Sequence, residues 1–343
     1  MRVAPEASEA TRERADAGEM LAAVPDRAAP QLLDDGAAAI DIPSRALTYP
    51  GLFAAAYAAQ AATRGGRPPR ETRDELMSRL RDAVRRAAES AARRDASGTD
   101  VWPVDLAPAE EHLVASLARA VVQVPQRPDR LEALAALRVG AWDDEDRAVF
   151  AAATDLLAQA WPEMLAELRI VVVQIALLRG FGVDGFTDVA THGAIYVNGA
   201  RLGPGVESGL DGSVRLAEAL VHEGAHNRCN AAALSTPFLA DAGSGDEPVL
   251  QTPLRADPRP LTGLLQQIVV LVRSTALYDR LLDAGAAQQA LVDRRETLRG
   301  QATEALRVIS GHTGRLTDHG RSIVAEARDL HARSPTIAAP AAT

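Results

Sequence analysis

The spacing of apolar residues along the chain predicts mostly helices. Residues 71–94 are polar overall, yet Leu76, Leu80, Val84 and Ala87 recur at the spacing of one helix face. The same pattern predicts further helices over residues 112–122, 130–137, 146–160, 164–178 and 261–283. The helix over 164–178 is apolar on most sides, so we expect it to lie at the centre of the fold.

One segment departs from the helical pattern. Residues 192–198 form a β-branched and aromatic run, which is the best strand candidate in the chain. Aromatic residues make up only 3% of the chain, so the core is built mainly from Ala, Leu and Val, and this composition favours helices over sheets. We therefore expect a mainly α fold of the α+β class, a helical bundle with a small β-sheet.

The strand candidate is followed by a glycine-rich loop over residues 203–212. Asp211 or Ser213 can cap a helix that runs from this loop to about Leu234. We expect the small sheet to lie next to this helix, in a core similar to that of the zincin peptidases.

The division of the chain follows its loops and its composition. Residues 1–30 mix Ala, charges and Pro without a period, which indicates a flexible segment or a loosely packed first helix. Residues 31–145 are predicted to form a helical region, residues 146–335 a domain that carries the chemistry, and residues 336–343 a disordered tail. The Arg-rich run over 79–94 is typical of a solvated helix face, with a partner surface as the alternative.

Composition and charge exclude several classes of protein. A formal net charge of −9 argues against binding nucleic acid by neutralising its phosphates. All 37 basic residues are Arg, which excludes Schiff-base lysines, lysine-bound pyridoxal phosphate and the lysine of a Walker A loop. Cys229 is the single cysteine, so neither an internal disulfide nor a cysteine-based zinc ribbon can form.

The sequence indicates neither a targeting signal nor a membrane span. Its N-terminal region carries charges throughout and lacks the apolar core of a signal peptide. The longest apolar run, residues 170–178, is interrupted by Gln174 and is far shorter than a membrane span. We therefore expect a cytoplasmic protein without nucleic-acid or membrane partners.

The strongest chemical signal is an H-E-x-x-H motif within the helix that ends near Leu234. His222 and His226 are four residues apart, so their imidazoles lie one turn apart on one helix face and can bind one divalent metal. Glu223 lies about 100° round the helix, near the metal, where zinc peptidases use a carboxylate as the base for the metal-bound water. The alternative is a pair of surface histidines beside a solvated glutamate.

Two histidines make an incomplete metal site, because zinc and iron sites need at least a third protein ligand. A loop rich in Ser, Thr, Pro, Gly and Asp is predicted from the end of this helix to Pro260. The spacing from His226 to the acidic residues of this loop is compatible with a zinc peptidase whose third ligand is acidic. The candidates for the third ligand are Asp241, Asp246, Glu247, Gln266 and His192.

Two arginines precede the apolar helix over 261–283. Arg255 and Arg259 approach the positive end of the helix dipole, which is an unfavourable place for a cation. An anion held between the guanidinium groups and the helix would explain this position. Pairing with Asp257 or another carboxylate would explain it equally well.

Residues 165–282 resemble a bacterial family of H-E-x-x-H proteins encoded beside ribosomally made peptides, described as 2-oxoglutarate-dependent peptide β-hydroxylases. The resemblance depends on the H-E-x-x-H helix together with the later Asp257-Pro258-Arg259-Pro260-Leu261 segment. It implies Fe(II) bound by His222 and His226, with 2-oxoglutarate and dioxygen as cosubstrates. It further implies that Arg259, or in second place Arg255, holds the 2-oxoglutarate carboxylate.

The chain departs from this family at Gln266, where family members usually have a histidine. If that histidine completes the iron site, Gln266 is a weaker, neutral donor in its place.

Three functions remain open on the sequence. The first is iron-dependent hydroxylation of a side-chain β-carbon in a peptide, which can carry a leader sequence. The second is a zinc-dependent peptidase with Glu223 as base and Glu247 or Asp246 as third ligand. The third is a non-catalytic module that binds a leader peptide or a partner enzyme.

Overall fold

The structure is a computed structural model that describes residues 1–32, 47–64, 73–96, 102, 104–124, 131–205, 208–240, 247–252, 255–285 and 288–334. The fold is mainly helical with a small β-sheet, as the sequence predicts. The predicted tail at 336–343 lies outside the described residues. Residues 1–30, predicted as a flexible segment or a first helix, contain most of helix α1, Ala7–Leu32.

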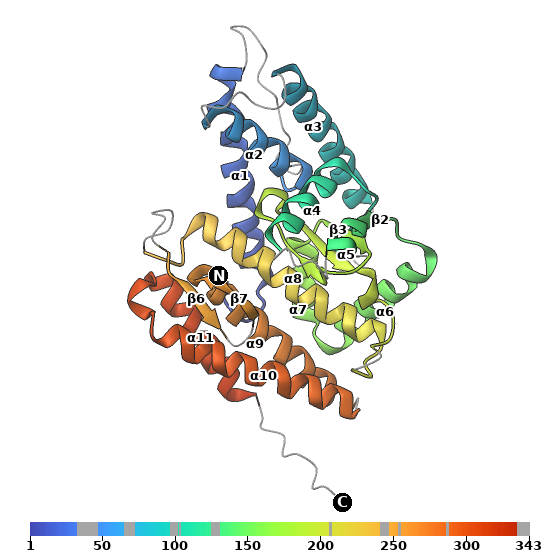
Figure 1. Cartoon of the computed structure of the whole chain (residues 1–343), viewed down its shortest axis with the longest axis vertical. Coiled ribbons are helices and arrows are strands. Elements are labelled where there is room, and N and C mark those ends of the chain that lie inside the picture. The colour runs from blue at the N-terminus through green and yellow to red at the C-terminus, as the bar shows by residue number, and fades with distance from the viewer. Residues whose placement is uncertain are drawn as a thin grey trace, which may run out of the picture. The chain divides into compact units, whose positions relative to one another are not determined.

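The chain divides into two compact units, and both are discontinuous in sequence (Figure 1). The unit that we call the sheet unit comprises Ser8–Asp143 and Arg169–Gly199. The unit that we call the motif unit comprises Met1–Ala7, Asp144–Leu168 and Ala200–Thr343. The boundaries predicted at 30 and 145 separate only contiguous stretches, so they do not describe this arrangement.

The sheet unit contains the five-stranded sheet and the helices that precede it in sequence. Its strands are β1 (Asp105–Ala107), β2 (Arg138–Gly140), β3 (Gln174–Arg179), β4 (Gly185–Phe186) and β5 (Ala194–Asn198). Its helices, besides most of α1, are α2 (Pro50–Arg64), α3 (Arg73–Ala96), α4 (Glu111–Gln123), α5 (Leu131–Ala136) and the short η2 (Val189–Thr191).

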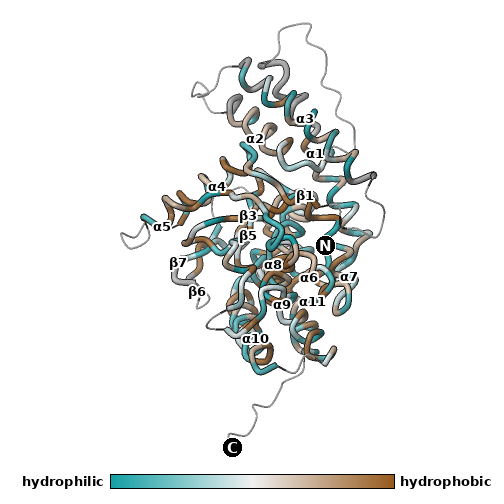
Figure 2. The backbone as a smooth tube through the Cα atoms, turned by 90° about the vertical axis from the view of Figure 1, so that its right-hand side faces the viewer, coloured by the Kyte–Doolittle hydropathy of each residue, from teal (hydrophilic) through white to brown (hydrophobic). Residues whose placement is uncertain are grey.

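The strand order is β1-β3-β5-β4, and β2 also pairs with β3. Figure 2 shows β1, β3 and β5 side by side. Strand β3 pairs in parallel with β5 on one edge. On its other edge, β3 pairs first with β1 in parallel and then with β2 in antiparallel fashion. Its side chains from Ile175 to Leu178 are fully buried, so the strand is apolar on both faces rather than alternating.

Strand β3 corrects the prediction of one long helix over 164–178. Helix α7 (Pro162–Val171) ends early, and β3 begins at Gln174. A continuous apolar run has no period that separates a buried helix from a buried strand, so the pattern does not place the change from α7 to β3. Strands β1 and β2 likewise correct the expectation that the first 140 residues are all helical, since three residues are too few for a period-2 pattern.

Other predictions are confirmed. Strand β5 lies within the run predicted over 192–198, and α3, α4 and α5 match the predicted helices of the first half closely. Helix α6 (Asp144–Ala160) begins two residues before its predicted start at 146, and α9 (Leu261–Asp283) has the predicted bounds. Apolar periodicity therefore located α3, α4, α6 and α9 well, but it missed the strands β1, β2 and β3.

The motif unit is built from long helices. Helix α8 (Gly212–Ser235) packs against α6 and α9, α10 (Gln289–Ser310) runs along α9, and α11 (Asp318–Arg333) packs against both (Figure 1). The remaining elements are η3 (Gly199–Arg201), η4 (Thr313–Arg315) and a hairpin of β6 (Val249–Thr252) with β7 (Arg255–Pro260), which falls in a stretch predicted as a loop.

Helix α9 is the one helix of the described residues that is long and apolar enough to cross a membrane. Of its apolar window, 72% is buried inside the fold, as expected for a core helix. Its length and composition are therefore explained by packing in the motif unit.

A buried cluster of charges fixes three helices of this unit and its N-terminal residues. Arg273 of α9 donates to Glu167 of α7 at 2.6 Å, and the Arg228 Nε of α8 lies 3.5 Å from the same carboxylate. Arg273 Nε also donates to the carbonyl oxygen of Val3, and the Glu6 amide donates to Glu167. All three charged side chains are almost completely buried, so each depends on the others for charge compensation.

Candidate functional site

Helix α8 carries the H-E-x-x-H motif in its middle. Asp211 occupies the N-cap position with extended backbone geometry, but its side chain makes no capping hydrogen bond. The helix runs past the predicted end near Leu234 by a single residue, to Ser235. Because α8 packs between α6 and α9, its residues from Leu216 to Ala232 are mostly buried. The motif is therefore held on a rigid core helix, which is a suitable support for a metal site.

The two motif histidines face each other. The ring centroids of His222 and His226 are 5.3 Å apart, and the ring planes are inclined by 60°. Both side chains are partly buried. Burial, together with His226, lowers the pKa of His222 to about 3. His222 is consequently neutral at physiological pH, which is the form that can bind a metal.

Gln266 orients the second histidine. Its Oε1 lies 2.8 Å from His226 Nδ1, and its Nε2 donates to Asn230 Oδ1 at 3.0 Å. Because Gln266 Nε2 donates to Asn230, Gln266 Oε1 is the atom that faces His226. This oxygen can only accept, so Nδ1 of His226 carries the hydrogen. The lone pair of His226 is then on Nε2, as in metal sites where the outer ring nitrogen donates to a carbonyl oxygen. Gln266, predicted as a metal ligand, therefore contacts the site through the His226 ring.

Glu223 is a buried carboxyl group whose Oε2 has no hydrogen-bond partner among the described residues. Burial raises its pKa to about 8, an effect that Arg201 reduces. An isolated buried carboxylate is unfavourable unless it is paired or binds a cation. Together with the neutral His222 and the oriented His226, this orphaned oxygen fits a divalent metal bound beside it.

The third ligand is not found among the acidic candidates that the structure describes. No three His, Cys, Asp or Glu side chains form a possible metal group there. Glu247, the candidate of the peptidase hypothesis, accepts hydrogen bonds from the Thr262 amide and hydroxyl at the start of α9. Asp241 and Asp246 lie outside the described residues, and His192 belongs to the sheet unit.

The two arginines lie at opposite ends of β7. Arg259 pairs with Leu250 and is followed almost at once by α9, seven residues before Gln266. Arg255 begins the strand, and its side chain lies outside the described part. The negative charge at the start of α9 is the carboxylate of Glu247, which accepts from the Thr262 amide. This carboxylate interacts favourably with the positive end of the helix dipole. Cys229 is fully buried and burial raises its pKa to about 12, so it is an inert core residue.

Sequence reasoning missed a charged cluster next to the motif. Glu218 lies one turn before His222 on α8 and is almost fully buried. It accepts from Tyr278 Oη at 2.6 Å and from two nitrogens of Arg294, while Arg201 Nη1 lies 4.0 Å away. Burial alone would raise the pKa of Glu218, but the Arg294 hydrogen bonds hold it below its usual value. The only signal in the sequence was the four-residue spacing of Glu218 and His222, because the arginines come from distant segments.

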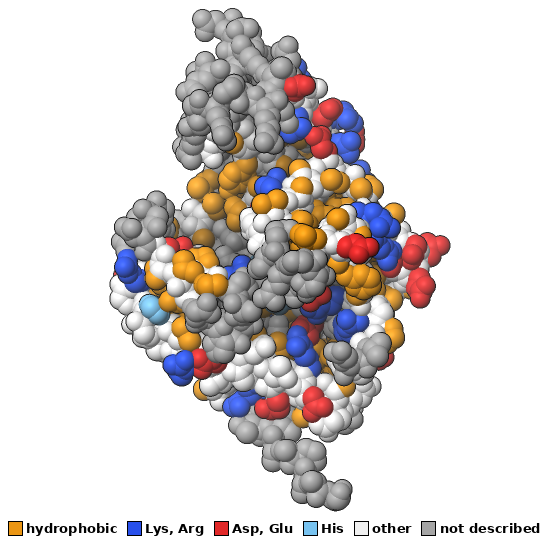
Figure 3. All heavy atoms as spheres, in the orientation of Figure 1, with side chains coloured by type: hydrophobic (Ala, Val, Ile, Leu, Met, Phe, Trp, Pro, Cys, Tyr) orange, Lys and Arg blue, Asp and Glu red, His pale blue; other side chains and the backbone are white. Residues whose placement is uncertain are grey.

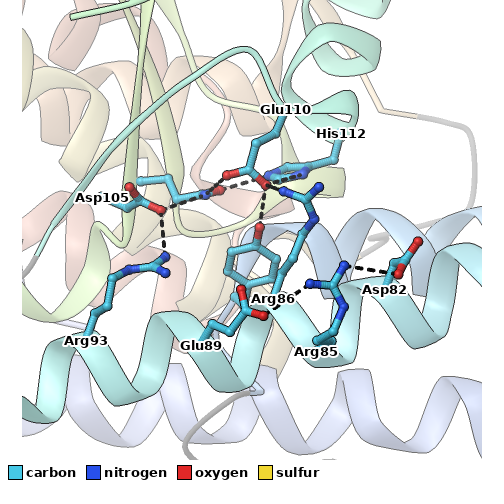
Figure 4. A network of polar contacts seen from close by, with 10 residues as sticks. Asp82, Arg85, Arg86, Glu89, Arg93, Asp105, Glu110 and His112 are labelled. Atoms are coloured by element: carbon cyan, nitrogen blue, oxygen red, sulfur yellow. Dashed lines mark hydrogen bonds and ion pairs between the residues drawn. The ribbon is translucent and has the colours of Figure 1, made fainter.

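A second polar network lies in the sheet unit (Figure 4). Glu110 accepts from Tyr49 Oη at 2.6 Å and from Gln174 Nε2 at 3.1 Å, and His112 Nε2 lies 2.8 Å from Gln174 Oε1. Arg86 and Arg93 of α3 reach Glu110 and Asp105, so part of the predicted solvated Arg-rich face is paired with partly buried acids. The mutual satisfaction of these groups indicates a structural role.

Acidic and basic side chains are intermingled on the face drawn in Figure 3, where the described arginines form no single continuous patch. No protein-family model matches the chain, and no curated protein is significantly similar to it.

Proposed function

We propose that this chain is an Fe(II)- and 2-oxoglutarate-dependent oxygenase that hydroxylates a side-chain β-carbon of a peptide. The observation that carries the proposal is the neutral pair His222 and His226, with Gln266 holding the tautomer of His226. Two imidazoles occupy only part of the coordination sphere of a divalent metal, so they leave positions for a ligand that chelates the metal. Iron with 2-oxoglutarate would supply the activation of dioxygen.

The chain's own residues would bind and orient the reactants. His222 and His226 would hold the metal, and Gln266 would fix the direction of the His226 lone pair. An arginine would hold a carboxylate of 2-oxoglutarate, and the resemblance implies Arg259, near the start of α9, for this role. Buried apolar neighbours on α8 and α9 would keep bulk water from the site.

A zinc-dependent peptidase is the second candidate, and Glu223 is the observation that favours it. A carboxyl group with a pKa of about 8 is close to the operating pH and beside the metal position, as a general base should be. Against this candidate, Glu247 is occupied at the start of α9 rather than available as the third ligand.

The deciding experiment loads the purified chain anaerobically with Fe(II) and adds 2-oxoglutarate. We expect one bound metal per chain and a charge-transfer absorption band on addition of 2-oxoglutarate. His222→Ala and His226→Ala should lose both signals, while His312→Ala, a histidine of the turn after α10, should keep them. Tight zinc with peptide cleavage and no absorption band would support the peptidase, and absence of metal binding would leave a peptide-binding module.

A further inference from the structure

Arg201 lies beside the metal-site helix with its hydrogen-bonding capacity unused. It ends η3, and its nearest charged partner is Glu218, with Nη1 and Oε1 4.0 Å apart. That distance is too long for a hydrogen bond. Among the described residues Arg201 has no hydrogen-bond partner, and its side chain keeps 26% of its surface exposed. A guanidinium group with five N–H donors is therefore available to a ligand.

Glu218 does not need Arg201 for charge compensation. Arg294 donates two hydrogen bonds to its carboxylate and Tyr278 donates a third. The pair of Glu218 and Arg294 is neutral as a unit, so Arg201 adds a positive charge that no described acid balances at hydrogen-bonding distance. Such a surplus cation next to a buried helix is unfavourable unless an anion joins it.

The surplus charge acts on the motif itself. Glu218 precedes His222 by one helical turn, so a guanidinium 4.0 Å from Glu218 is held close to the same helix face. Arg201 therefore lies near the part of α8 that carries His222.

We propose that Arg201 binds a carboxylate of the acidic ligand that occupies the metal site. This inference rests on the proposed function, in which that ligand is 2-oxoglutarate. Two neutral imidazoles do not reduce the charge of a divalent cation, and Glu223 can supply only one negative charge, so a metal placed near Arg201 favours an acidic ligand. A dicarboxylate supplies it, and the planar guanidinium matches a carboxylate through two parallel hydrogen bonds.

The test compares two 2-oxo acids that differ by one carboxylate, 2-oxoglutarate and 2-oxobutyrate. Their affinities are measured by calorimetry, without oxygen, for the Fe(II)-loaded and the metal-free chain. We expect the wild type to prefer 2-oxoglutarate, and Arg201→Ala and Arg201→Gln to weaken its binding by about 10- to 100-fold while leaving metal affinity unchanged. Arg201→Lys should restore part of the affinity, because lysine keeps the positive charge but lacks the two parallel N–H donors of a guanidinium group.

The control is Arg307→Ala, which removes an exposed arginine of α10 paired with Glu304 and should leave all affinities unchanged. Arg259→Ala tests the residue that the resemblance implies. If Arg259→Ala abolishes the preference for 2-oxoglutarate while both Arg201 variants retain wild-type affinities, the assignment to Arg201 is overturned. Circular dichroism confirms that each variant is folded.

The outcome separates this inference from the proposed function. A wild type that binds Fe(II) but neither 2-oxo acid overturns the role of Arg201 and the oxygenase together. A chain that binds no metal, yet binds 2-oxoglutarate in an Arg201-dependent way, rejects the oxygenase and supports the carboxylate site. Iron-dependent binding of 2-oxoglutarate that is unaffected by Arg201→Ala keeps the oxygenase and overturns the inference.

Discussion

The amide oxygen of Gln266 lies 2.8 Å from Nδ1 of His226, and the two residues come from helices α9 and α8. This contact links the predicted metal helix to the central apolar helix of the motif unit. Asn230, one turn after His226, accepts from the other end of the same amide. The hydrogen bonds from His226 to Gln266 and from Gln266 to Asn230 thus fix the ring of His226 without a bound metal.

Removal of this contact should weaken metal binding. We expect Gln266→Ala to lower Co(II) or Fe(II) affinity by about 10- to 100-fold, the usual effect of losing the outer partner of a metal-bound histidine. Gln266→Glu keeps an acceptor at the same place and should retain most of the affinity. Metal titration followed by absorption spectroscopy measures both. Equal affinities for Gln266→Ala and the wild type would contradict the role of this contact.

The loop before α8 should tolerate no side chain at Gly212. A Cβ atom there would lie 1.8 Å from the carbonyl oxygen of Leu202, next to Arg201. We expect Gly212→Ala to displace this segment, lower the melting temperature and weaken binding of 2-oxoglutarate. Gly300→Ala in the middle of α10 is the matched control, since no atom lies within 4 Å of its added Cβ, and alanine there should stabilise the helix by about 0.5–1 kcal/mol.

The buried carboxylate of Glu167 should be essential for stability. Glu167→Ala leaves Arg273 and Arg228 buried without their counter-charge, which costs about 3–5 kcal/mol. Urea unfolding followed by circular dichroism measures the loss. Glu304→Ala removes a partly exposed acid whose partner, Arg307, is exposed, and it should barely change the midpoint of unfolding. A Glu167→Ala variant as stable as the wild type would show that the cluster is not a structural requirement.

His192 should make the sheet unit sensitive to acid. Burial, with a smaller effect of Arg14, lowers its pKa to about 4 from about 6.5 in the unfolded chain. Between these values the unfolded chain binds a proton that the folded chain does not, so stability falls as the pH falls through this window. The total loss is on the order of 3 kcal/mol.

The measurement is urea unfolding at pH 7, 6, 5 and 4. His192→Leu should reduce the pH dependence relative to the wild type, because leucine fits the contact with Phe53 and binds no proton. For each protein, the free energy of unfolding is plotted against pH. The acidic residues and the other histidines contribute equally to both plots, so the difference between the two slopes reports on His192. If both proteins lose stability in parallel as the pH falls, His192 is not the responsible group.

The long helices and the motif helix could be predicted from the sequence because their signals are local. Helix α9 has the predicted bounds, and α8 brings His222 and His226 together by helical spacing alone. Strand β3 could not be separated from a helix, because both of its faces are buried and its apolar run carries no period. The hairpin of β6 and β7 was missed among residues that sequence reasoning assigned to a loop.

The partners of the site could not be predicted, because they come from distant parts of the chain. Gln266 lies 40 residues after His226, and Arg294 lies 76 residues after Glu218. No spacing rule relates such positions, since their distance depends on how α8, α9 and α10 pack. The prediction that Glu247 completes a zinc site could not foresee that Thr262 would use its carboxylate at the start of α9.

Both units are interrupted in sequence, and this has a consequence for biosynthesis. Strand β3, the middle of the sheet, is translated only after Asp144–Leu168 of the motif unit. During that interval β1 and β2 have left the ribosome without the strand that they pair with, and their open edges can meet other chains. Neither unit can be obtained as a contiguous fragment, so expression trials should keep the whole chain and favour slow translation or added chaperones.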